Sequence, residues 1–153
     1  MKQFLGVLLV AAGLLAGSAQ AGTALVPLLE TDIQPGCGCS FTRFNTREAP
    51  IVRWSSEGKK KAQLRAEGKV QTLDLRQEKY IPERDGGPRP SDRFVLHVSN
   101  GDWNVQAVMN AVGAACKGKG KTCSLTRYEG RLVVLEGGRQ RSEIPAVGIC
   151  GCE

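Results

Sequence analysis

The stretch "PGCGCS", Pro35 to Ser40, carries two cysteines separated by one glycine, and the same Cys-Gly-Cys pattern returns in "ICGCE", Ile149 to Glu153. In an extended strand, residues i and i+2 point to the same face. Each triplet therefore presents two thiols on one face of a strand. A bridge within one triplet would close a very small, strained ring, so we expect the two triplets to be bridged to each other.

Two strand registers would join both pairs of cysteines at once. An antiparallel register predicts the bridges Cys37–Cys152 and Cys39–Cys150. A parallel register predicts Cys37–Cys150 and Cys39–Cys152 instead. In either register the central glycine leaves the opposite face of the strand uncrowded, so both registers stay open at this point.

Cys116 and Cys123 are the other two of the six cysteines, and a bridge between them would close a short loop. An even number of cysteines in an exported chain indicates disulfides. One alternative is a redox-active Cys-Gly-Cys. Another is a site for zinc or cuprous copper with four thiolate ligands, although zinc sites usually have two or more residues between their cysteines; its ligands would be Cys37, Cys39, Cys150 and Cys152. We favour disulfides and expect no cofactor.

The first residues, "MKQFLGVLLVAAGLLAGSAQAG", predict a cleavable secretory signal over residues 1–21. Lys2 supplies the charged start, and Ala19-Gln20-Ala21 has the small-residue pattern of a cleavage site. The apolar run between them, Phe4 to Ala16, is too short to span the hydrocarbon of a bilayer. We therefore expect a periplasmic or secreted protein that keeps no transmembrane segment after cleavage.

The formal net charge of the chain is +6 at pH 7, which favours acidic partners. For an exported protein these are an acidic protein or a polyanion of the cell envelope rather than nucleic acid. The sequence has no nucleophile-elbow or phosphate-binding glycine motif, and a catalytic role for its one histidine, His97, would need a nucleophile and an orienting acid that the sequence does not place. We therefore expect a protein without enzymatic activity.

Short apolar stretches alternate with turn signals from Cys37 onward, which is typical of an all-β domain. Within them, Phe94, Leu96 and Val98 alternate with other residues and predict one buried face of a strand. We expect a small disulfide-stapled β-barrel or β-sandwich. The predicted domain plan is a leader segment over 22–36 and a single β domain over 37–153.

Two Glu-Gly dipeptides, Glu67-Gly68 and Glu129-Gly130, predict hairpin turns between short strands. The segments around them are alike, because "RAEGKVQTL", Arg65 to Leu73, matches "RYEGRLVVL", Arg127 to Leu135, at an offset of 62 residues. We favour two independent hairpins with similar turn chemistry. A duplicated β unit is the alternative.

Residues 103–116, "WNVQAVMNAVGAAC", fit either a strand or a helix. As a strand, the alternate residues from Trp103 to Ala111 share one face. As a helix with Asp102 as N-cap, an apolar face would form from Val105, Val108, Met109, Val112 and Cys116. The β context favours a strand, and one short helix near 103–116 is the alternative. The Pro- and Gly-rich segment 82–93 predicts a long exposed loop.

Three motifs, Cys39-Ser40-Phe41, "YEGRLVVLEGG" at 128–138 and "VGICGC" at 147–152, resemble those of small exported bacterial β-proteins that end in Cys-Gly-Cys and whose function is largely unassigned. Trp54, Gly58 and Ala62-Gln63-Leu64 resemble, at altered spacing, the Trp, Gly, Ala-x-Leu pattern of periplasmic lysozyme inhibitors. The second resemblance implies a small disulfide-stapled β-barrel. The targets of those inhibitors are cationic, and this chain is basic too. Neither resemblance assigns a functional residue to this chain.

The segment "CKGKGKTC", Cys116 to Cys123, is the leading candidate for a binding loop. If its cysteines are bridged, Lys117, Lys119 and Lys121 present three ammonium groups on a constrained loop, and such pre-ordering reduces the entropy lost on binding. We therefore expect an inhibitor-like or other binding module of the bacterial envelope that contacts an acidic or protein partner. The alternatives are a periplasmic metal-binding protein that uses the paired Cys-Gly-Cys motifs and a purely structural envelope component.

Two further groups are weaker candidates for a binding surface. Lys59, Lys60 and Lys61 form a second basic turn, although a solvated turn would explain either lysine cluster equally well. Trp54 and Trp103 would suit a glycan or protein contact if they were exposed beside a basic loop. We favour core positions for both tryptophans.

We predict that all six cysteines of the exported protein are oxidised in pairs. Intact-mass measurement before and after reduction should then show a gain of six hydrogens, one for each cysteine, and the denatured, unreduced protein should not react with a thiol reagent. Four reactive thiols together with a bound metal ion would contradict the three-disulfide prediction.

Overall fold

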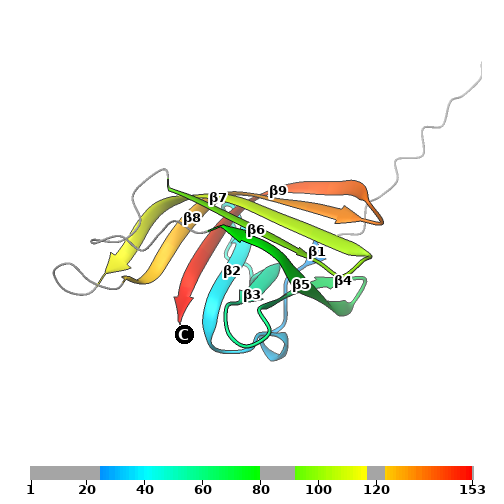
Figure 1. Cartoon of the computed structure of the whole chain (residues 1–153), viewed down its shortest axis with the longest axis horizontal. Coiled ribbons are helices and arrows are strands. Elements are labelled where there is room, and N and C mark those ends of the chain that lie inside the picture. The colour runs from blue at the N-terminus through cyan, green and yellow to red at the C-terminus, as the bar shows by residue number, and fades with distance from the viewer. Residues whose placement is uncertain (1–24, 80–91, 117–122, 153) are drawn as a thin grey trace, which may run out of the picture.

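The computed structural model describes residues 25–79, 92–116 and 123–152, and within these ranges the chain is almost entirely β-structure (Figure 1). The elements are β1 (Leu25–Val26), the 3₁₀ turn η1 (Glu30–Asp32), β2 (Cys37–Arg43), β3 (Val52–Ser55), β4 (Lys61–Ala66), β5 (Lys69–Lys79), β6 (Arg93–Ser99), β7 (Trp103–Cys116), β8 (Cys123–Glu136) and β9 (Arg139–Cys152). None of the described residues forms a helix with the length and apolar character needed to cross a membrane. The predicted signal, 1–21, and most of the predicted loop, 82–93, lie outside the described residues.

Eight strands form a closed antiparallel barrel, so the predicted all-β fold class is confirmed and its barrel form is selected over the sandwich. From β2 to β9, each strand pairs with the next one along the chain. The pairing of β2 with β9 then closes the circle. Figure 1 shows this closure where the red end of β9 runs beside the cyan strand β2.

The antiparallel register of the two cysteine triplets is confirmed, and the parallel alternative is wrong. Cys37 lies opposite Cys152 and Cys39 lies opposite Cys150, and both pairs form disulfides. The glycine of the first triplet is also required, because a Cβ atom on Gly38 would overlap the backbone of Trp54 on β3. The four sulfur atoms are all paired, so none is present as a thiolate that could bind zinc or copper.

The barrel interior is filled by side chains from alternate positions of the strands. Phe94 lies at the centre of an aromatic cluster, with ring centroids 6.2 Å from Phe41, 6.3 Å from Trp54 and 5.4 Å from Tyr128. Eight strands enclose just enough space for packed side chains. The remaining space is occupied mainly by aliphatic residues and one methionine, and the largest fully buried of these in the core are Ile51, Leu64, Leu73, Leu96, Met109 and Leu132.

Residues 103–116 form strand β7 throughout, so the helical alternative for this segment is wrong. The buried positions follow the alternation predicted for a strand: Trp103, Val105, Ala107, Met109 and Ala111. The predicted face of β6 is confirmed in the same way, because Phe94, Leu96 and Val98 are all buried.

The two Glu-Gly dipeptides adopt different structures. Glu67 and Gly68 form the predicted turn between β4 and β5, with positive φ angles of 52° and 73°, as expected for a two-residue hairpin loop. Glu129 and Gly130 lie inside the continuous strand β8, so the predicted second turn is wrong. A Cβ atom on Gly130 would overlap the Val108 carbonyl oxygen and lie 2.9 Å from Met109 Cα. Space for the neighbouring strand, not turn geometry, therefore requires this glycine, and the similarity between the two segments reflects neither paired hairpins nor a repeated unit.

Residues 25–36 of the predicted leader segment lie on the barrel. Strand β1 pairs with β4 beyond the last β3–β4 pair, and Leu28 is buried. Asp32 accepts a hydrogen bond from Arg65 at 2.9 Å. Arg53 is buried on the outer side of β3 and donates to the Gly36 carbonyl at 2.8 Å. These contacts fix the approach of the chain to the first cysteine.

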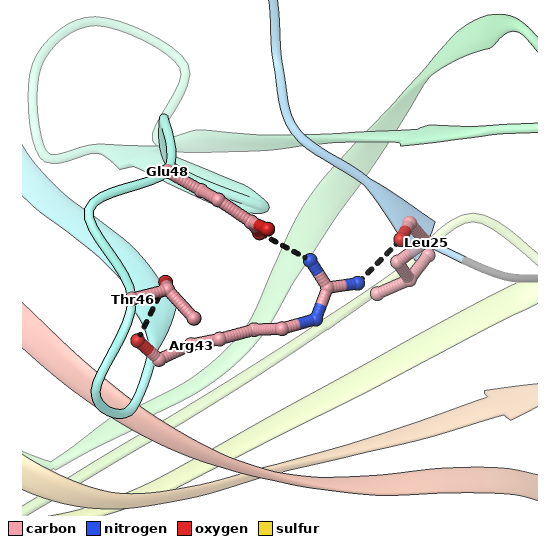
Figure 2. A network of polar contacts seen from close by, with 4 residues as sticks. All are labelled: Leu25, Arg43, Thr46 and Glu48. Atoms are coloured by element: carbon pink, nitrogen blue, oxygen red, sulfur yellow. Dashed lines mark hydrogen bonds and ion pairs between the residues drawn. The ribbon is translucent and has the colours of Figure 1, made fainter.

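Arg43 connects three segments at the barrel end opposite the cysteines (Figure 2). Its guanidinium donates to the Leu25 carbonyl of β1 at 2.6 Å and pairs with Glu48, in the β2–β3 loop, at 2.9 Å. Its own carbonyl accepts a hydrogen bond from the Thr46 hydroxyl at 3.1 Å. The network holds β1 and the loop against the end of β2.

Alanine substitutions at two glycines in neighbouring strands test whether Gly130 is required because the next strand leaves no space for a side chain. We expect Gly130→Ala to lower the free energy of unfolding by about 1–3 kcal/mol, because the added methyl group must displace the backbone of β7. Gly113→Ala on β7 is the matched control, since a Cβ atom added there would have no other atom within 4 Å. Urea unfolding measures the free energy of unfolding of both variants. An equal loss in the two variants would contradict the explanation that Gly130 is required by lack of space.

Candidate functional site

The barrel interior offers no place for Trp54 or Trp103 to contact a partner. Trp54 is 1% exposed and Trp103 is 5% exposed, and both belong to the core. Neither tryptophan is therefore a surface contact, and the core positions that we favoured for both are confirmed. Their burial has a simple cause, because both residues occupy inward positions of strands whose other inward residues are apolar. Candidate sites must lie on the outer surface or at the barrel ends.

The hairpin formed by β7 and β8 continues past the end of β6. The β6–β7 pairing ends at Arg93 and Asn110, followed by one hydrogen bond from the Ala111 amide to the Asp92 carbonyl at 2.8 Å. The β7–β8 pairing continues to Cys116 and Cys123. We call this extension, 111–116 with 123–128, the arm. In Figure 1 it projects to the left, where the yellow end of β7 runs beside the start of β8.

The arm determines where the candidate lysine loop begins and ends. Cys116 and Cys123 are directly opposite each other in the backbone pairing, which is the arrangement that the predicted bridge between them requires. Lys117, Lys119 and Lys121 themselves lie outside the described residues.

The second basic turn, between β3 and β4, is largely neutralised by the barrel. Lys61 pairs with Asp74 at 2.5 Å, and Lys60 pairs with Glu78 at 3.5 Å. The hydrogen bond and the charge of Lys61 hold the pKa of the Asp74 carboxyl below its usual value. Two of the three ammonium groups thus have acidic partners within the chain, so Lys59–Lys61 is the weaker of the two lysine clusters as a binding surface.

A concavity of about 580 Å³ lies on the outer surface of strands β6 to β9. We call it the outer groove. Its apolar part is formed by Val108, Gly130 and Pro145. Its polar part is formed by Arg93, Asn110, Arg131 and Glu143. The groove had no counterpart among the sites predicted from the sequence, because alternation shows which residues face outward but not where the surface of a sheet becomes concave.

The charged residues of the outer groove are only loosely paired. Arg131 contacts Glu143 at 3.3 Å, and the two side chains are 56% and 46% exposed. Exposed pairs of this kind contribute about 0–1 kcal/mol. Arg93 is exposed and has no ion pair among the residues that the structure describes. The groove therefore offers two guanidinium groups that are available to an incoming carboxylate.

The outer face of the arm combines basic and apolar side chains. Arg127 lies opposite Ile149 of β9. Leu125, two residues before Arg127 on β8, lies on the same face. Ile149 is 46% exposed and Leu125 is 38% exposed, and Val112 in the neighbouring bulge is 44% exposed. Exposed large apolar residues are therefore grouped between the outer groove and the lysine loop.

His97 does not belong to a catalytic arrangement in the described structure. It lies on β6 between Gln77 of β5 and Gln106 of β7, away from any cysteine. Its Nε2 atom is buried without a hydrogen-bond partner within the described ranges. Across the same ranges, no group of three or more His, Cys, Asp or Glu side chains could hold a metal ion. The absence of enzymatic activity stays a prediction.

Comparison of the chain with protein-family models, with curated protein sequences and with solved structures gives no match. The resemblances to small exported β-proteins and to lysozyme inhibitors therefore stay predictions.

Tyr128, where the arm joins the barrel, should make stability depend on alkaline pH. Burial raises the pKa of its phenol, and the nearby Asp92 carboxylate raises it further. A group with a raised folded-state pKa contributes stability that is complete below its unfolded pKa, about 10, and is lost as pH rises through the folded value. Urea unfolding should therefore show a loss of stability above about pH 10 that is smaller in Tyr128→Phe than in the wild type.

The Asp92→Asn variant provides an independent check on the cause of the Tyr128 shift. Removing the negative charge should lower the pKa of Tyr128 toward its usual value without changing its burial. The phenolate absorbance of the variant during titration, compared with that of the wild type, measures the change. An unchanged titration curve would show that Asp92 does not act on this phenol.

Proposed function

We propose that the protein is an exported, non-enzymatic binding module that contacts an acidic partner through the Cys116–Cys123 loop. One observation supports this proposal above the others: the β7–β8 backbone pairing continues past the end of β6 as far as Cys116 and Cys123. The loop between these cysteines contains three lysines and no acidic residue. Its ends are held by β7 and β8, whereas the acidic residues that pair with Lys60 and Lys61 lie on β5.

The ends and the composition of the loop favour binding in two ways. A bridge between Cys116 and Cys123 would restrict the loop before it binds, and less conformational entropy would then be lost in the complex. Alternation of lysine with glycine keeps the side chains sterically accessible, since Gly118 and Gly120 add no bulk between the ammonium groups. An acidic protein or an envelope polyanion would meet these charges with little steric hindrance.

Export supports the same function. The two disulfides of the β2–β9 pair belong to the kind of bond that persists in oxidising compartments. The first 21 residues have the charged start, apolar run and Ala-x-Ala pattern of a secretory signal. We therefore place the protein in the periplasm or in the extracellular medium, where its partner would be a protein or an envelope component.

Replacement of the three loop lysines tests the proposed function. We expect Lys117→Ala/Lys119→Ala/Lys121→Ala to weaken binding to a fluorescent oligoglutamate and to a heparin oligosaccharide, measured by anisotropy, while thermal stability is unchanged. The loss of three cations should also reduce the salt dependence of binding.

The matched control carries the same charge change elsewhere. Arg47, Lys69 and Arg139 are exposed and lie at the opposite end of the barrel, so their replacement by alanine should leave binding largely unchanged. Equal losses in both triple variants would show that net charge alone attracts the acidic probes. Unchanged binding in the loop variant would remove the loop from the binding site.

A further inference from the structure

We infer that the outer groove and the outer face of the arm form one track for an extended polypeptide segment that carries both acidic and apolar side chains. This inference rests on the proposed function, because it identifies the class of acidic partner that the arm and its loop would bind. It adds a second contact region that the sequence alone does not indicate.

The shape and chemistry of the outer groove fit part of such a segment. An apolar floor from Val108, Gly130 and Pro145 can take an aliphatic side chain. Arg93 and Arg131 at its edge can each bind a carboxylate, and the planar guanidinium group suits two-point hydrogen bonding to carboxylates. An apolar side chain and a neighbouring acidic side chain would thus be bound together.

The outward positions of β8 lead from the groove along the arm. On β8 the outward residues follow the order Arg131, Glu129, Arg127 and Leu125, and Ile149 of β9 lies beside Arg127. Along β8 the track thus presents basic, acidic, basic and apolar side chains in turn, with the apolar Ile149 beside Arg127. An extended chain, whose side chains alternate in direction, can match this spacing better than a helix can.

The same features argue against a polyanionic glycan as the natural occupant. A sulfated or uronic-acid chain gains most of its affinity from a continuous row of cations. Here, Glu129 and Glu143 interrupt the row of arginines and would repel a chain that carries an anionic group on every unit, whereas a polypeptide can place an apolar side chain beside each glutamate. The exposed Leu125 and Ile149 would contribute nothing to binding a glycan of this kind, whereas apolar side chains of a polypeptide would bury them.

The existing ion pairs leave the arginines available. Arg131 contacts Glu143 at 3.3 Å in an exposed pair, which a partner carboxylate can replace at small cost. Arg127 is held by Glu129 at 3.0 Å, and both side chains are at least one third exposed. The intramolecular carboxylates thus act as competitors of the partner, and removal of one of them should strengthen binding.

Three probes distinguish the possible partners: a short peptide of alternating glutamate and leucine, an oligoglutamate of equal charge, and a heparin oligosaccharide. We expect the wild-type protein to bind the Glu-Leu peptide at least about tenfold more tightly than the oligoglutamate, because only the former buries apolar surface in the track. Equal or weaker binding of the Glu-Leu peptide would overturn the inference, and preferential binding of heparin would assign the track to a glycan instead.

Substitutions in the groove provide the decisive comparison. Arg93→Ala/Arg131→Ala should weaken binding of the Glu-Leu peptide by about tenfold, whereas the control Arg47→Ala/Lys69→Ala, with the same charge change at the other barrel end, should not. Glu143→Gln should strengthen binding, an effect that misfolding cannot produce. Leu125→Ser/Ile149→Ser should remove the preference for the Glu-Leu peptide and leave oligoglutamate binding unchanged.

The outcomes separate this inference from the proposed function. If the triple lysine variant loses binding but the groove and arm variants do not, the loop is the whole site and the track is wrong. If the groove and arm variants lose binding but the lysine variant does not, the track is correct and the loop is not the contact. If the wild-type protein binds none of the acidic probes, both proposals fail.

Discussion

The pairing of β2 with β9 is the constraint on which the rest of the structure depends. All other strand pairs of the barrel join neighbours in sequence, whereas this pair joins the first and last barrel strands, and its two disulfides connect residues 115 and 111 positions apart. In the chain-entropy model, one bridge across so long a segment stabilises the folded state by about 4–5 kcal/mol. The second bridge adds less by this route, because the loop is already closed. Its main effect is to fix the register, since a slip by one residue would break both bridges and turn every side chain to the wrong face.

Closure at this register requires matched large and small residues inside the barrel. The Phe41 ring on β2 lies over Gly148 on β9, where a Cβ atom would come within 2.9 Å of its Cε1 atom. The β2–β9 register thus determines which cysteines are bridged and where the Phe41 ring lies in the core. The described inward side chains are buried in this core, and the candidate binding surface lies outside it, where Arg93 and Arg131 line the groove.

The parts that could be predicted from the sequence are those governed by local alternation. The i and i+2 spacing of Cys37 and Cys39 predicted a shared face, and Phe94 to Val98 predicted a buried one. The prediction of a turn at Glu129-Gly130 was wrong because a glycine can be required for two reasons, a positive φ angle or the close approach of another strand. Only the structure shows which reason applies. The outer groove could not be predicted, because its residues come from four strands and its depth depends on sheet curvature. The lysine loop was identifiable by its composition alone.

The disulfides also connect the scaffold to the candidate binding surface. In the arm, Thr126 of β8 pairs directly with Cys150 of β9, and Leu125 pairs with Gly151. One edge of the arm is therefore held by a strand that is itself bridged twice to β2. Without these bridges, the last residues of β9 would keep only backbone hydrogen bonds to either neighbour and would fray as chain ends do. The paired Cys-Gly-Cys motifs, which first suggested an active site, thus contribute to binding indirectly, by keeping the arm and its outer face in a fixed position.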